Sequence, residues 1–123
     1  NTYFEGREEV IIKLVIESVE EILNKNIEED KNLIKDLVRK GIEHATFAGS
    51  IVIRVCVDDY ENALANKSKI LIFSKNINSI KFVTDYALVK GECIIESEVG
   101  NIDVGVSTQF KKLKELYYDL IKD

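Results

Sequence analysis

The chain has 123 residues, of which 46% are hydrophobic and 32% charged, and its formal net charge is −5. This length predicts one domain with a single core, and the composition is that of a globular protein rather than a disordered one. Lysine and arginine are spread along the chain without forming a basic stripe, which argues against nucleic acid as a partner. No apolar run approaches the ~20 residues that a membrane span needs, so we expect no direct membrane insertion.

The sequence contains no methionine and a single histidine, His44. We therefore expect the chain to begin inside a longer polypeptide, with residues 1–6 as the end of an upstream helical arm and 1–123 as one domain. Cys56 and Cys93 lie in apolar runs, which predicts two buried free thiols. A disulfide between them requires neighbouring strands, and a reducing cytosol argues against it. Without Cys-x-x-Cys spacing, no standard zinc site can be assembled.

The first third of the chain is predicted to form two helices. Residues 7–27 carry apolar side chains on more than one side, whereas the helix expected at residues 30–45 carries a clean double row of apolar residues, with Asp30 as the expected N-cap. We expect these two helices to pack as an antiparallel hairpin. Gly41 lies inside the second helix, where glycine costs ~1 kcal/mol relative to alanine, and it indicates close approach of another backbone.

The middle of the chain is predicted to be a strand followed by a helix. Residues 51–57 (IVIRVCV) alternate between two mostly apolar faces, which indicates a central or well-covered strand. Asp58 and Glu61 then form a capping-box pattern for a third helix, which runs to about residue 73.

The remaining strands lie in the second half of the chain. Residues 80–84 predict a second strand, and residues 93–98 and 101–106 predict a β-hairpin around a turn at Val99–Gly100. Gly91, just before the hairpin, is expected to take a positive φ. The predicted order is α-α-β-α-β-β-β-α. The fold class is therefore α+β, with an N-terminal antiparallel helix pair, a small mixed sheet of about four strands ending in a β-hairpin, and packing helices.

The last helix, which Ser107 can cap, carries two adjacent tyrosines. Because Tyr117 and Tyr118 are neighbours in the helix, they cannot both face its core. Tyr118 is therefore a candidate interface anchor, with an ordinary surface tyrosine as the alternative.

Patterns that carry catalysis are missing from the sequence. His44 is the sole histidine, so neither cysteine has an activating base, and there is no G-x-S-x-G segment or phosphate-binding glycine loop. We therefore expect a protein that is not an enzyme, with no catalytic residue, no metal and no cofactor.

The carboxylates of the hairpin require a partner. A turn at Val99–Gly100 places Glu96 opposite Asp103, which is unfavourable for like charges. Arg54 is the expected neutralising cation, because it is the one charge within its strand and its guanidinium can grip carboxylates. Two alternatives stay open: this face is a docking patch for a partner, or Glu96, Glu98 and Asp103 form the site of a metal-dependent hydrolase.

The same hairpin carries a family resemblance. The run GECIIESEVGNID at 91–103, followed by STQF at 107–110, resembles the C-terminal segment of the FliH family of flagellar assembly proteins. The segments IRV at 53–55 and DDYE at 58–61 resemble the family's strand-to-helix junction. The likeness covers residues 8–120, and the hairpin is its specific part. Injectisome stator proteins share this domain, and the E-type stalk subunit of V-type and A-type ATPases has a related hairpin; the STQ segment favours the flagellar branch over that stalk subunit.

The resemblance implies a cytoplasmic, non-catalytic stator or peripheral-stalk domain. Such proteins dimerise through long N-terminal helical arms, here expected upstream of residue 1, and the part missing upstream links them to the cytoplasmic ring of the motor. Their C-terminal domain binds the N-terminal region of the hexameric flagellar export ATPase and restrains its activity. A rotary ATPase stalk subunit and an injectisome stator are the alternatives. The candidate partner-binding residues are Arg54, Glu96, Glu98, Asp103, Gln109 and Tyr118.

Overall fold

The structure is a computed structural model that describes residues 6–44 and 47–122. Its centre is a four-stranded mixed sheet with the strand order β2-β1-β3-β4. Strand β1 (Gly49–Val55) pairs in parallel with β2 (Ile77–Thr84) and antiparallel with β3 (Cys93–Ser97), which continues through a hairpin into β4 (Gly100–Asp103). The predicted α+β class, the four-stranded mixed sheet and the hairpin are confirmed.

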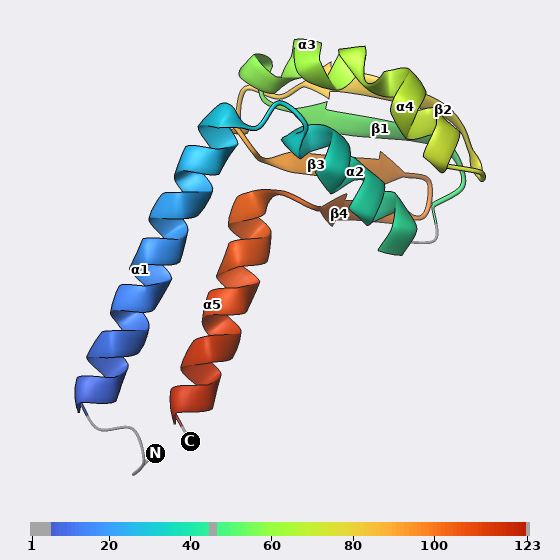
Figure 1. The fold of residues 1–123 in the computed structure, drawn as a ribbon. Helices are drawn as coiled ribbons and strands as arrows, with labels where there is room; N and C mark the ends of the chain where they lie inside the picture. The colour runs from blue at the N-terminus through green and yellow to red at the C-terminus, as the bar shows by residue number, and fades with distance from the viewer. Residues whose placement is uncertain (1–5, 45–46, 123) are drawn as a thin grey trace.

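Three helices cover one face of the sheet. These are α2 (Leu33–His44), α3 (Val57–Ala65) and α4 (Lys67–Phe73), and they lie on the same side of the strands (Figure 1). The period-2 pattern of β1 sends every second side chain toward these helices, where burial of apolar surface drives the packing. The largest fully buried side chains of this core are Ile34, Val38, Ile51, Ile53, Val55, Ile70, Cys93 and Ile95.

The remaining two helices leave the sheet together. Helix α1 (Gly6–Glu29) lies along α5 (Val106–Lys122), and the first residues of α1 and the last residues of α5 end on the same side, away from the sheet (Figure 1). The predicted antiparallel pair of the first two helices is therefore wrong. The apolar residues of α2 pack against the sheet and are not available to α1. The apolar stripe of α1 packs against that of α5 instead.

The predicted third helix is two helices, α3 and α4, separated at Asn66. The Asn66 backbone N–H donates to the carbonyl of Ala63 at 3.1 Å, and the Asn66 side-chain amide donates to the carbonyl of Asn62 at 2.8 Å. Because the side chain occupies the acceptor that the next helical turn would use, the helix ends there.

Three predicted caps lie at different positions. Helix α3 begins at Val57 after Cys56, so Asp58 lies inside its first turn rather than before it. Helix α5 begins at Val106, which places Ser107 inside the helix in the same way. The carboxylate of Asp30 accepts the N–H of Asn32 at 2.8 Å and closes the turn that precedes α2.

Both cysteines are buried and free, as predicted. Burial, together with the nearby charges of Asp103 and Asp59, raises the pKa of the Cys93 thiol to about 12. Burial also raises the pKa of Cys56. Neutral, buried thiols of this kind act as small apolar side chains.

Candidate protein-binding surfaces

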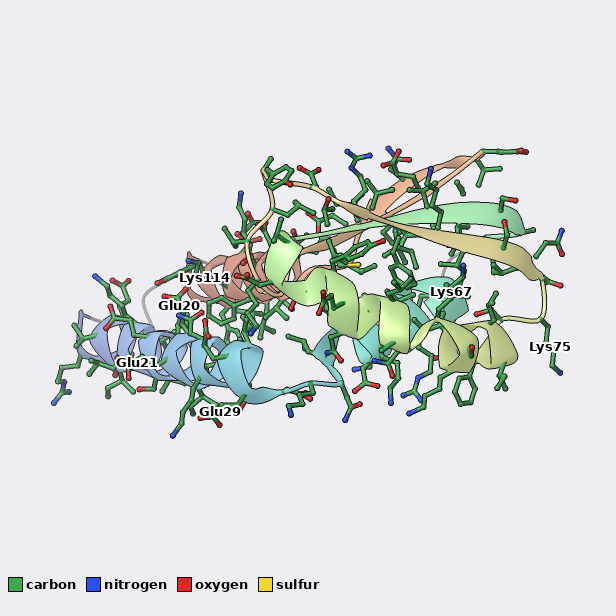
Figure 2. The ribbon with its side chains drawn as sticks, turned by 90° about the horizontal axis from the view of Figure 1, so that it is seen from above. Glu20, Glu21, Glu29, Lys67, Lys75 and Lys114 are labelled. Carbon is green, nitrogen blue, oxygen red and sulfur yellow. The ribbon has the colours of Figure 1, made fainter. Side chains whose placement is uncertain are left out.

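Among the described residues, no helix covers the second face of the sheet. Viewed from above, the helices lie on one side of the strands and side chains alone project from the other (Figure 2). Strand pairing places Val52 and Arg54 of β1 on this face, beside Glu96 and Ile94 of β3 and Val83 of β2. All five side chains are half-buried. We call this surface the open sheet face; it combines an apolar floor with a fixed charge.

Arg54 holds two carboxylates on the open sheet face. Its Nη1 lies 2.9 Å from Oε1 of Glu96, and its Nε lies 3.1 Å from Oδ2 of Asp85. The hydrogen bonds to Asp85 and then to Glu96 raise the pKa of the guanidinium. The expected contact between Arg54 and Glu96 is therefore present, and both partners are oriented by charge-assisted hydrogen bonds.

Asp103 does not belong to this network, because the hairpin register differs from the prediction. Glu96 pairs with Asn101 and Ile94 pairs with Asp103, so the turn lies at residues 98–99. Asp103 Oδ1 instead accepts the backbone N–H of Gly105 at 2.9 Å. The predicted pairing of Glu96 with Asp103 is therefore wrong.

Asp85 takes the place that sequence reasoning assigned to Asp103. It follows β2 directly, and its backbone N–H donates to the carbonyl of Val55 at 2.8 Å. Because β1 and β2 run in parallel, the residue after β2 lies beside the end of β1, close to Arg54. The sequence carries only part of this signal, the position of Asp85 directly after a predicted strand; the parallel pairing that brings it to Arg54 is seen only in the structure.

Acid should weaken the Arg54 network through Asp85. The backbone N–H of Ala87, followed by Arg54, lowers the pKa of Asp85 below its ordinary value. A depressed carboxylate pKa contributes stability that is present above the unfolded-state pKa and is lost as the pH falls below it. We expect the Asp85→Asn variant to lose less stability than the unmodified chain between about pH 4 and pH 2, measured by urea unfolding at each pH. Equal acid sensitivity of the two proteins would contradict this expectation.

The other candidate residues lie outside the Arg54 network. Glu98 is exposed in the hairpin turn. Gln109 donates from Nε2 to the carbonyl of Val104 at 2.6 Å, so its amide ties α5 to the end of the sheet. Tyr118 is half-buried between α5 and α1, whereas Tyr117 is the more exposed of the two tyrosines.

The α1–α5 pair has two unlike sides. One side is a groove with polar and charged lining residues, among them Glu20, Asn24, Lys111 and Glu115. Glu20 and Lys114 come from opposite helices of the pair (Figure 2). The other side is a groove of about 350 Å³ that is apolar apart from Lys114, and its lining residues are Ile12, Val15, Ile16, Val19, Phe110, Leu113, Lys114, Tyr117 and Leu120. We call this second surface the apolar side of the pair.

Within residues 6–44 and 47–122, no group of three or more histidine, cysteine, aspartate or glutamate side chains is placed to hold a metal ion. Over the same residues, no helix combines the length and apolar character that a membrane crossing requires.

Comparison with known proteins names the family. The family "Flagellar assembly protein FliH" matches residues 2–113, which is most of the chain. The chain belongs to the FliH family. A curated FliH-family relative, the flagellar assembly protein FliH of Borreliella burgdorferi (strain ATCC 35210 / DSM 4680 / CIP 102532 / B31), is 26% identical over 107 residues. That alignment covers 87% of this chain and 35% of the relative, so the chain spans about a third of the length of its relative. The FliH resemblance drawn from the hairpin is confirmed.

Proposed function

We propose that the chain is a non-catalytic stator domain that binds and regulates the flagellar type III export ATPase. The observation that carries the proposal is the FliH family match over residues 2–113. The shape supports it, because a helix pair projects from a compact α+β body as a stalk would (Figure 1). In this proposal the protein acts in the cytoplasm, and an arm upstream of residue 1 dimerises and reaches the cytoplasmic ring of the motor.

The open sheet face is the surface we assign to the ATPase. A half-buried apolar floor around a fixed Arg54–Glu96 ion pair suits a protein interface, where oriented charges give register and the floor gives affinity. Glu98 and Asp103 extend the polar rim along the hairpin. Gln109 and Tyr118 lie on α5 outside this face, so we place them at the margin of the binding region.

Calorimetric titration with the purified flagellar export ATPase of the same organism tests the proposal. We expect the unmodified chain to bind and the Arg54→Glu variant to bind at least about 30-fold more weakly. Lys75→Glu, a charge reversal of the same size at an exposed residue in the turn after α4, is the matched control and should bind normally. Glu96→Gln keeps the shape of the side chain and should give an intermediate loss.

The alternatives give different results in the same experiment. Binding to the B subunit of a V-type ATPase but not to the flagellar enzyme would replace the proposal with a rotary-stalk subunit, and preference for an injectisome ATPase would replace it with an injectisome stator. Circular dichroism must show each variant folded. ATP hydrolysis by the pure chain alone would contradict a non-catalytic role.

A further inference from the structure

The open sheet face carries no aromatic side chain among the described residues of its four strands. Strand pairing and the period of two place only aliphatic, polar and charged side chains on it: Ser50, Val52, Arg54, Ser79, Lys81, Val83, Ile94, Glu96, Asn101 and Asp103. The cores of protein interfaces, by contrast, are enriched in aromatic residues, and a few aromatic or arginine side chains carry most of the binding free energy. Arg54 can be one such anchor. An aromatic anchor must come from beside this face.

An exposed tyrosine lies next to the open sheet face. Tyr86 directly follows Asp85, whose carboxylate binds Arg54 at 3.1 Å. At 87%, it is the most exposed large apolar or aromatic residue in the described part of the chain. Val89 in the same loop and Val57 at the start of α3 are also exposed, and the three residues line one hollow of about 260 Å³. We call Val57, Tyr86 and Val89 the Tyr86 patch.

The loop that carries Tyr86 is fixed by hydrogen bonds from its own side chains. The carboxylate of Asp85 accepts the backbone N–H of Ala87 at 2.9 Å, and the carboxylate of Glu92 accepts the backbone N–H of Val89 at 2.7 Å. A loop that is already ordered loses little conformational entropy when a partner binds. An exposed aromatic ring on such a loop therefore costs less to bury than one on a segment that must first be ordered.

We propose that the Tyr86 patch binds the export ATPase together with the open sheet face, and that the ring of Tyr86 is the aromatic anchor. The inference rests on the proposed function and deepens it, because it names where apolar contact holds the ATPase. Asp85 joins the two surfaces, since one of its carboxylate oxygens binds Arg54 and the other binds the loop. Asp58 and Lys90 line the same hollow and supply the polar rim that excludes water from such an anchor.

Calorimetric titration of the chain with the purified export ATPase tests the anchor. We expect Tyr86→Ala to bind at least about 30-fold more weakly than the unmodified chain. Tyr86→Phe keeps the ring and should bind within about threefold of the unmodified chain. Because Tyr86 lies at the surface, neither variant should shift the midpoint of urea unfolding, so the loss of binding is not a loss of folding.

Phe73→Ala is the matched control for the loss of an exposed aromatic ring. Phe73 is 60% exposed at the end of α4 and precedes β2, whereas Tyr86 follows β2. The eight residues of the strand therefore place the two residues on the order of 25 Å apart. Phe73→Ala should bind the ATPase like the unmodified chain. Equal losses from Phe73→Ala and Tyr86→Ala would overturn the assignment of the anchor to Tyr86.

Photo-crosslinking locates the contact without depending on a change in affinity. Ala87→Cys, next to the intact Tyr86, and Ser68→Cys in α4 are exposed positions that can be labelled with benzophenone maleimide. The buried Cys56 and Cys93 leave the introduced thiols as the reactive ones. We expect irradiation to join the ATPase to the label at residue 87 and not to the label at residue 68. The reverse pattern would overturn the proposal.

Failure of this inference and failure of the proposed function give different results. If the unmodified chain binds the ATPase and Tyr86→Ala binds it equally well, the anchor is overturned and the binding of the ATPase stands. If Arg54→Glu alone then weakens binding, the contact is confined to the open sheet face. If the unmodified chain does not bind the ATPase, the proposed function is overturned, and the anchor with it.

Discussion

Replacing Gly41 with valine is expected to lower the free energy of unfolding by about 3 kcal/mol, near the upper end for overpacking a core. Gly41 is the point where α2 crosses the sheet. A Cβ atom there would lie 2.7 Å from Cγ1 of Val104 and 2.8 Å from Cδ1 of Ile95. Both neighbours are buried, and a valine adds two further methyl groups. Urea unfolding measures the loss.

Gly6→Val is the matched control for this substitution. Gly6 begins α1, and a Cβ there would meet no atom within 4 Å. Gly6 is the first residue of its helix and Gly41 lies inside α2, where valine has a slightly better helix propensity than glycine. A loss of stability in Gly41→Val that Gly6→Val does not show therefore reports the steric cost. A Gly41→Val protein as stable as Gly6→Val would show that α2 does not press on the sheet as described.

Asp59→Ala, which removes a buried carboxylate, is expected to lower the free energy of unfolding by about 2 kcal/mol. Asp59 is 6% exposed in the first turn of α3. Its Oδ2 accepts the backbone N–H of Gly91 at 2.9 Å and faces the Cys56 thiol at 3.5 Å. Alanine would leave the Gly91 N–H buried without an acceptor. Asp59→Asn keeps an oxygen for that N–H, so its loss should be smaller.

Asp58→Ala is the control that separates the hydrogen bond between Asp59 and Gly91 from the stabilising effect that any carboxylate has in the first turn of a helix. Asp58 lies next to Asp59 in the same turn but is exposed. Its removal should change the free energy of unfolding by about 0.5 kcal/mol or less. Amide hydrogen exchange should show faster exchange at Gly91 in Asp59→Ala and not in Asp58→Ala. Equal behaviour of the two variants would mean that the bond to Gly91 contributes little.

The β-hairpin shows how far local pattern reaches. Its two strands are readable from apolar alternation, and Gly91 takes the expected positive φ of 87°. The observed turn lies at residues 98–99, one position before the predicted turn at Val99–Gly100, so every strand pair of the hairpin shifts with it. Ser97 fixes the turn at residues 98–99, because its Oγ accepts the Val99 N–H at 3.3 Å and its hydroxyl donates to the Gly100 carbonyl at 3.0 Å. Two adjacent turn sites were compatible with the pattern, and a side-chain bond selects between them.

Arg54 shows where local pattern ends. A lone arginine within an apolar strand predicts carboxylate partners, and Glu96 is one of them. The second partner, Asp85, depends on the parallel pairing of β1 with β2, which joins segments far apart in the chain. Strand order and direction result from how the helices cover the sheet, and no short run of residues encodes them.

The sequence by itself determined the fold class, the presence of the four strands, the two buried thiols and the family, because each rests on residues that are neighbours in the chain. Only the tertiary structure decided that α1 packs along α5, that the second face of the sheet lies open, and that Arg54 binds Asp85 rather than Asp103. These outcomes depend on which apolar surfaces meet across the folded molecule. By its pattern alone, the apolar stripe of α1 could pack on α2 or on α5. Because the apolar residues of α2 are buried against the sheet, α1 packs on α5.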